Sequence, residues 1–164
     1  MKRLVTARPI TASAFLPFGY LLESPKTGAR ENFAAPIFNG RAAAKANLAL
    51  VHEEPADTEF SATTLERHPL STQSFFPLSV KRYLVVVCGS CANGDPDLDS
   101  LHAFECRGDQ AVSYAARTWH MGIKTLESPG VFAMLVHEDN TATDCEFREV
   151  ESFDVRVASD YGLI

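Results

Sequence analysis

Short apolar runs separated by turn residues follow one another along most of the chain, and long stretches with helical apolar spacing are missing. The clearest run, Arg82–Cys88, is apolar and rich in β-branched residues, which predicts a central strand covered on both faces. Gly130–His137 predicts a second buried strand. Only Thr11–Leu16, with Thr11 as N-cap, and one turn at Asp97–Leu101 are candidate helices. The pattern predicts an all-β fold, a β-barrel or a sandwich of two sheets, with one or two short helices.

One aromatic run, Ser74–Leu78, contains Pro77, which has no backbone N–H to donate. This strand is therefore expected at a sheet edge or at a bulge. With 164 residues, the chain is expected to form one domain spanning residues 1–164. A domain of this size buries about 70% of the surface of its unfolded chain, so it folds without a disulfide or a structural metal.

The charge balance excludes several classes of partner. Lys and Arg total 15 against 21 Asp and Glu, which gives a net charge of −6. Nucleic acids and anionic membrane surfaces attract basic patches, so neither is an expected partner. No apolar run approaches the length of about 18 residues that a membrane-spanning helix needs. No apolar segment follows Lys2 and Arg3 either, and a cytoplasmic location is expected.

The four cysteines are expected to be reduced, because the chain is large and shows no secretory signal. Cys88-Gly-Ser-Cys91 has the spacing of a redox or metal motif. It closes an apolar strand and enters a turn, however, whereas a redox motif opens a helix. A buried cysteine at a strand end is the favoured interpretation.

Candidate chemistry gathers in two distant segments. Glu66 and His68 are two residues apart, so in an extended strand they point to the same face. Gln73 follows five residues after His68, and Trp119-His120 supplies another imidazole. A small barrel brings such side chains from different strands into one pocket. Imidazole and oxygen ligands suit a divalent transition metal, and a metal-free polar pocket is the alternative.

The segment Glu66-Arg-His-Pro-Leu-Ser-Thr-Gln-Ser-Phe-Phe-Pro-Leu78 resembles the signature of the ureidoglycolate lyase family. Further segments resemble the family in the same order, and together they span about residues 5–152. These segments are Pro9–Gly19, Tyr83–Val87, Pro96–Phe104 and Tyr114–His120.

The resemblance implies a cupin-like β-barrel, usually a homodimer, that splits ureidoglycolate into glyoxylate and urea in allantoin and purine breakdown. Nickel is associated with some members of the family. In the cupin pattern, Glu66 and His68 take the paired ligand positions, Gln73 takes the carboxylate position and His120 takes the last one. The expected metal ligands are therefore Glu66, His68, Gln73 and His120, and nickel is the ion that the resemblance implies.

The reaction needs a base with a pKa near the operating pH. His68 or His120 fits this role, as does Glu66 if burial raises its pKa. The amide of Gln73 can bind the ureido group. Tyr114 lies six residues before His120 and can share its face, which makes it a candidate substrate contact.

Asn39 is either a turn residue or, by family analogy, a substrate contact. Arg67 points away from Glu66 in a regular strand and is a weak candidate to bind the substrate carboxylate. Lys81, Arg82 and Arg117 are alternatives to Arg67.

Met121-Gly122 stands where the family often has His-Pro. Two other functions therefore stay open. One is a non-catalytic cupin that binds a small hydroxy acid or sugar acid. The other is a differently acting cupin enzyme, such as a metal-dependent isomerase or dioxygenase.

Overall fold

The computed structural model describes residues 2–25 and 27–157, and this part of the chain is mostly β. Its one helix, α1 (Ala12–Phe15), is too short to cross a membrane, and so no helix of the described part can do so. The strands are β1 (Arg3–Thr6), β2 (Arg8–Pro9), β3 (Gly19–Leu22), β4 (Lys45–Glu53), β5 (Glu59–Arg67), β6 (Gln73–Pro77), β7 (Arg82–Ser90), β8 (Pro96–Arg107), β9 (Ala111–Tyr114), β10 (Trp119–His120), β11 (Lys124–Thr125), β12 (Gly130–Glu138) and β13 (Glu146–Arg156).

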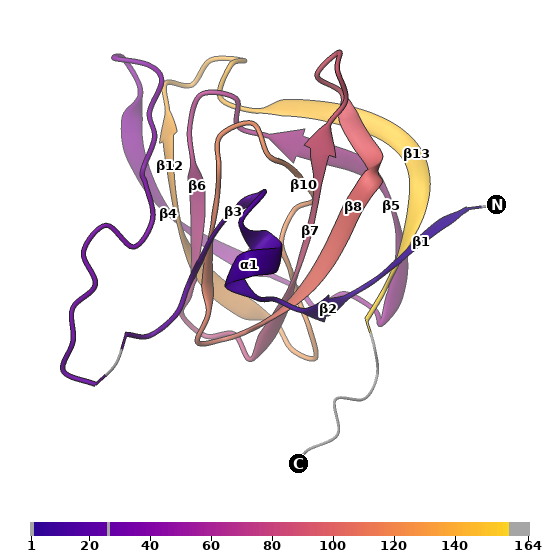
Figure 1. Cartoon of the computed structure of the whole chain (residues 1–164), viewed down its shortest axis with the longest axis horizontal. Helices are drawn as coiled ribbons and strands as arrows, with labels where there is room; N and C mark the ends of the chain where they lie inside the picture. Colours follow the sequence, from indigo (N-terminus) through magenta and orange to yellow (C-terminus); the bar gives the residue numbers. More distant parts are fainter. Residues whose placement is uncertain (1, 26, 158–164) are drawn as a thin grey trace.

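The strands form two sheets, and the first curls into a nearly closed barrel (Figure 1). Its strand order is β1-β13-β5-β10-β7-β8-β2, with β11 also paired to β7. The second sheet is antiparallel in the order β3-β9-β6-β12-β4. The all-β prediction with a barrel is therefore confirmed.

Strand β7 separates two hydrophobic cores. Tyr83, Val85 and Val87 face a core shared with the second sheet and α1, whereas Leu84 and Val86 face a core inside the curled first sheet. All five residues are fully buried. A strand buried on both faces has no polar side, which explains its unbroken apolar sequence. The prediction of a central strand at Arg82–Cys88 is confirmed.

Helix α1 begins where the sequence predicted it. The hydroxyl of Thr11 accepts a hydrogen bond from the backbone N–H of Ala14 at 3.2 Å, as an N-cap does. The second expected helix is wrong, because Asp97–Leu101 lies inside β8. Pairing with β7 supplies the ladder hydrogen bonds there, as in the register pair Gly89 and Asp97. Those bonds outweigh the weak propensity for a single helical turn.

The edge position expected for Ser74–Leu78 holds only for its last part. Strand β6 pairs with β12 throughout, but β9 pairs only with Gln73–Phe75, so Pro77 is unpaired on the β9 side. Pro77 is the last residue of β6, opposite Phe132. At a strand end the missing N–H interrupts no continuing ladder, so proline is tolerated in an interior strand.

Gly108 provides a test of the backbone packing after β8. A Cβ atom at Gly108 would overlap the carbonyl oxygen of Val80, and neither backbone can move without breaking the bond from the N–H of Gly108 to the oxygen of Lys81. We expect Gly108→Ala to lower the free energy of unfolding by about 2–4 kcal/mol, measured by urea denaturation. Gly122→Ala is the control, since a Cβ there meets no atom within 4 Å. Equal denaturation midpoints for the two variants would contradict this packing.

Candidate functional site

Two remote segments meet in the curled sheet and bring three candidate side chains together. Strand β10 pairs with β5 so that His120 lies opposite Glu66, and β10 also pairs with β7. One ligating atom from each of Glu66, His68 and His120 lies within 4.8 Å of the other two. We call these residues the Glu66–His68–His120 cluster. The meeting of the two segments, on which the sequence prediction depends, is confirmed.

Both imidazoles are held by backbone carbonyls. The Nδ1 atom of His68 lies 2.9 Å from the carbonyl oxygen of Asp144, and that of His120 lies 2.9 Å from the oxygen of Thr118. A carbonyl oxygen only accepts hydrogen bonds, so each Nδ1 carries the proton. A neutral imidazole with its proton on Nδ1 has a lone pair on Nε2. The Nε2 atoms of both histidines are buried; that of His68 has no hydrogen-bond partner in the described part of the chain, and that of His120 faces the Glu66 carboxylate.

Glu66 lies between a histidine and a cysteine. Its Oε1 atom is 3.4 Å from Nε2 of His120, and its Oε2 atom is 3.8 Å from Sγ of Cys145, which donates to it. Burial raises the pKa of Glu66, but the hydrogen bond and charge of His120, with the charge of His68, outweigh it and leave the pKa below its usual value. The condition under which Glu66 would serve as the base, a pKa raised by burial, is therefore not met.

The environment of His68 favours its neutral form. Burial and then the charge of His120 lower the pKa of His68, and the Asp144 carbonyl and Glu66 offset this only in part. A neutral imidazole that donates one N–H to a carbonyl and presents the other nitrogen is the form that binds metals. The Nε2 atoms of two imidazoles beside a carboxylate fit a divalent transition metal, and Glu66, His68 and His120 would hold it.

Tyr114 lies directly against His120. The two rings stack with their centroids 4.3 Å apart and an interplanar angle of 15°. Tyr114 is buried in the core between the sheets, and its hydroxyl has no partner in the described residues. The prediction that Tyr114 shares a face with His120 is confirmed. Tyr114 supports the imidazole from behind, and its expected contact with substrate stays a prediction.

Gln73 continues the polar surface across the second sheet. Tyr114, Gln73, Val136 and Asn47 are successive register partners on β9, β6, β12 and β4, so their side chains lie on one face. The amide nitrogen of Gln73 donates to the sulfur of Met134 at 3.2 Å, and its Oε1 atom is buried without a partner in the described residues. The Oε1 atom is therefore available to a metal or a substrate N–H.

Asn39 has its amide fully used in a turn. Its Oδ1 atom accepts the backbone N–H of Arg41 at 3.0 Å, and its Nδ2 atom donates to the oxygen of Ala44 at 3.2 Å. Of the two roles expected for Asn39, the structure favours the turn residue. Arg67 points away from the cluster as expected, since its guanidinium lies 4.4 Å from the ring centre of Trp119 and pairs with Glu146.

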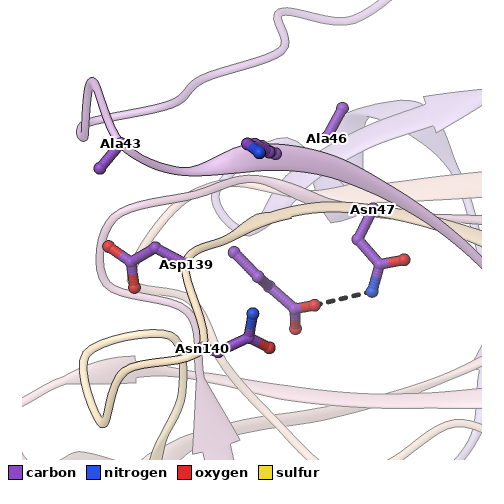
Figure 2. Close-up of a pocket in the computed structure, with 7 residues that line it drawn as sticks. Ala43, Ala46, Asn47, Asp139 and Asn140 are labelled. Atoms are coloured by element: carbon purple, nitrogen blue, oxygen red, sulfur yellow. Dashed lines mark hydrogen bonds between the residues drawn. The ribbon is translucent and has the colours of Figure 1, made fainter.

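A cavity of about 570 Å³ lies at the start of β4 and the end of β12 (Figure 2). Lys45, Asn47 and Glu138 are among the residues that line it, and Nδ2 of Asn47 donates to Glu138 at 2.7 Å. The Glu138 carboxylate also raises the pKa of His68 through its charge, although burial keeps the net shift downward. Glu138 thus links the cavity to the cluster.

Sequence reasoning missed Lys45, Asn47 and Glu138. The signal that could have found them is the two-residue period of β4, which places Lys45, Asn47 and Val51 on one face, with Val51 packed against the core. Cys88 and Cys91 are both free, and Cys88 is buried among apolar side chains. Burial raises the pKa of Cys88 to about 12, which favours the structural interpretation of this pair over a redox one.

Comparison with known proteins agrees with the geometry. The family model described as ureidoglycolate lyase matches residues 2–158. A ureidoglycolate lyase of Chelativorans sp. (strain BNC1) is 33% identical over 132 residues, which cover 72% of this chain and 75% of that protein. The ureidoglycolate lyase of Rhizobium etli (strain CFN 42) is 31% identical, over 89% of this chain and 91% of that protein. The ureidoglycolate lyase of Mesorhizobium japonicum is 27% identical, over 93% of this chain and 98% of that protein. The chain belongs to the ureidoglycolate lyase family.

Proposed function

We propose that this protein is a carbon–nitrogen lyase that cleaves ureidoglycolate into glyoxylate and urea in allantoin and purine catabolism. The observation that carries the proposal is the Glu66–His68–His120 cluster, with two buried imidazole lone pairs beside a carboxylate. Membership of the family and the similarity to ureidoglycolate lyases of other organisms support the same substrate.

The reaction moves one proton and breaks one bond. The hydroxyl of ureidoglycolate loses its proton, a C=O bond forms, the C–N bond breaks, and the departing urea nitrogen takes up a proton. His120 is the residue we assign to accept and return this proton, since the Glu66 carboxylate 3.4 Å from its Nε2 stabilises the imidazolium. The neutral His68 accepts a hydrogen bond from the substrate, and the Oε1 atom of Gln73 accepts one from the ureido group.

A divalent ion fits the same three residues. Bound there, it would act as a Lewis acid that lowers the pKa of the substrate hydroxyl, and nickel is the ion that the family resemblance suggests. The lone pairs of His68 and His120 cannot bind a metal and a proton together. Comparing the turnover of ureidoglycolate by metal-depleted and by nickel-supplied protein therefore decides which role the two histidines take.

Lys45 is the best-placed cation for the substrate carboxylate. It lines the cavity next to Glu138 and forms no ion pair in the part of the chain that the structure describes. Of the cations expected from the sequence, Arg82 is engaged with Glu105 and Glu127. Arg117 lines a different cavity with Tyr20, a residue on the outward face of β3.

The cluster is tested by turnover. His68→Ala and His120→Asn should each lower kcat for ureidoglycolate at least 100-fold, measured as released urea and glyoxylate, since each removes a lone pair from the reacting group. His52→Ala, at an exposed histidine on β4, is the control and should keep full activity.

Three outcomes would contradict the proposed function. The first is no urea above background from the native sequence, with or without nickel. The second is thermal stabilisation by hydroxy acids or sugar acids without turnover, which would indicate a binding cupin. The third is iron bound near one equivalent, which would indicate a different cupin enzyme.

The role of Lys45 is tested by steady-state kinetics. Lys45→Met should raise KM for ureidoglycolate about tenfold or more and leave kcat within a few-fold, because a carboxylate contact far from the breaking bond acts equally in ground and transition states. Lys81→Met removes an exposed lysine before β7 and should not change KM. An unchanged KM in Lys45→Met would place the carboxylate elsewhere.

The outward face of the second sheet supports the proposal of a homodimer. Leu48 and Leu50 on β4 are 72% and 74% exposed, and Phe76 on β6 is 37% exposed. Leu48 is the register partner of Leu135, so apolar side chains continue across the sheet. An apolar sheet face of this kind is commonly covered by a second copy of the same chain.

The dimer is tested by sedimentation equilibrium. Leu50→Lys should shift the protein from dimer to monomer, since it places a charge in the proposed interface. Leu16→Lys is the matched control, because Leu16 is a leucine of similar exposure, 63%, at the end of α1. A native protein that sediments as a monomer would exclude the dimer.

The cytoplasmic location is also a proposal. It is supported by the four cysteines, which are all free, two of them buried. Free buried thiols are typical of reducing compartments.

A further inference from the structure

The loop between β12 and β13 holds one of the site imidazoles. We call residues 139–144 the 139–144 loop. Its last residue, Asp144, provides the carbonyl oxygen that accepts the Nδ1–H of His68 at 2.9 Å. The tautomer of His68, and with it the lone pair of its Nε2 atom, therefore depends on where this loop places one carbonyl group.

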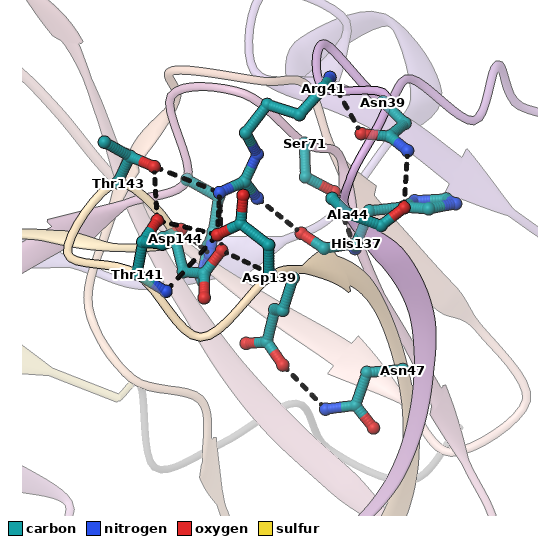
Figure 3. A network of polar contacts seen from close by, with 12 residues as sticks. Asn39, Arg41, Ala44, Asn47, Ser71, His137, Asp139, Thr141, Thr143 and Asp144 are labelled. Atoms are coloured by element: carbon teal, nitrogen blue, oxygen red, sulfur yellow. Dashed lines mark hydrogen bonds and ion pairs between the residues drawn. The ribbon is translucent and has the colours of Figure 1, made fainter.

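The guanidinium of Arg41 joins this loop to the segment before β4, in addition to the hydrogen bonds that Asp139, Thr141 and Asp144 make within the loop (Figure 3). The Nη1 atom of Arg41 lies 2.9 Å from Oδ1 of Asp139 and 2.6 Å from Oδ1 of Asp144, and it donates to the hydroxyl of Thr143 at 3.1 Å. Its Nη2 atom donates to the carbonyl oxygen of His137 at 3.0 Å. The Arg41 side chain is only 12% exposed, so its contacts are largely shielded from solvent.

The loop needs this cation because its own charges repel one another. Asp139 and Asp144 both contribute a carboxylate oxygen to the same nitrogen, and their side chains are 18% and 13% exposed. Two largely buried carboxylates so close together repel each other, and a positive partner offsets that repulsion. Arg41 is itself fixed from the other side, since its backbone N–H donates to Asn39.

We infer that Arg41 is a positioning residue for the active site. It draws Asp139 and Asp144 together and so fixes the position of the Asp144 carbonyl. This carbonyl keeps the proton of His68 on Nδ1, and the lone pair of Nε2 is then available to a substrate or a metal. The inference rests on the proposed function only in taking the Glu66–His68–His120 cluster as the reacting group. The turn at Asn39 contributes only indirectly, because Asn39 Oδ1 accepts the backbone N–H of Arg41.

The direct test is the tautomer of His68 in the protein without substrate or metal. Nitrogen-15 NMR of the imidazoles, at a pH where His68 is neutral, should show the Nδ1–H form in the native sequence. Arg41→Gln should give a mixture of tautomers and lower kcat/KM about 10- to 100-fold, as loss of a group supporting a ligand does. Arg41→Lys keeps the positive charge and should recover part of the Nδ1–H population and part of kcat/KM.

Controls separate positioning from folding. Arg148→Gln removes an exposed arginine that pairs with Asp95, and should leave the tautomer and kcat/KM unchanged. If Arg41→Gln does not fold, Asp139→Asn weakens the same network with Arg41 in place and should also give mixed tautomers. A folded Arg41→Gln or Asp139→Asn protein that keeps His68 wholly in the Nδ1–H form would overturn the inference. If Arg41→Gln changes the tautomer but the native sequence releases no urea, the positioning role is supported and the lyase activity is rejected.

Discussion

The pairing of β10 between β5 and β7 is the constraint on which the site depends. It sets His120 opposite Glu66 on one side and opposite Val87 on the other. Because side chains alternate along a strand, a slip of one residue would point Trp119 toward Glu66 and bury His120 in the other core. Trp119 opposes such a slip, since it is fully buried and its indole N–H donates to the oxygen of Gly94 at 3.1 Å. Trp119 thus fixes the direction in which the side chain of His120 points.

Strand β7 connects the site to both hydrophobic cores. Its two faces belong to two cores, so the curled first sheet and the second sheet are packed on a common wall. The site lies on the face toward the second sheet, where Tyr114 stacks on His120 and Gln73 lies next to Tyr114 in register. Polar groups there replace apolar packing. Among the residues that the structure describes, Nε2 of His68, the hydroxyl of Tyr114 and Oε1 of Gln73 are buried without partners. Each such atom costs about 1–3 kcal/mol, a cost that a ligand for the site would offset.

The sequence predicted the parts that depend on local pattern. The apolar run at Arg82–Cys88 predicts a buried strand, and the two-residue spacing of Glu66 and His68 makes their side chains point in the same direction. Three features depend on contacts between strands or loops rather than on local pattern, and were not predictable in this way. The strand at Asp97–Leu101 forms because β7 pairs with it. The pKa of Glu66 falls because two imidazoles approach it, and the role of Arg41 depends on carboxylates about 100 residues later.

Backbone carbonyls, rather than carboxylates, orient both imidazoles, and this choice suits the chemistry. A carboxylate on Nδ1 would favour imidazolium and hold the proton that the reaction needs to move. The carbonyls of Asp144 and Thr118 fix the same tautomer without adding a charge. The carboxylate of the cluster, Glu66, instead lies on the Nε2 side of His120, where a proton or a metal ion would arrive. The negative charge is therefore placed where positive charge develops or binds, and the supporting groups behind the imidazoles stay neutral.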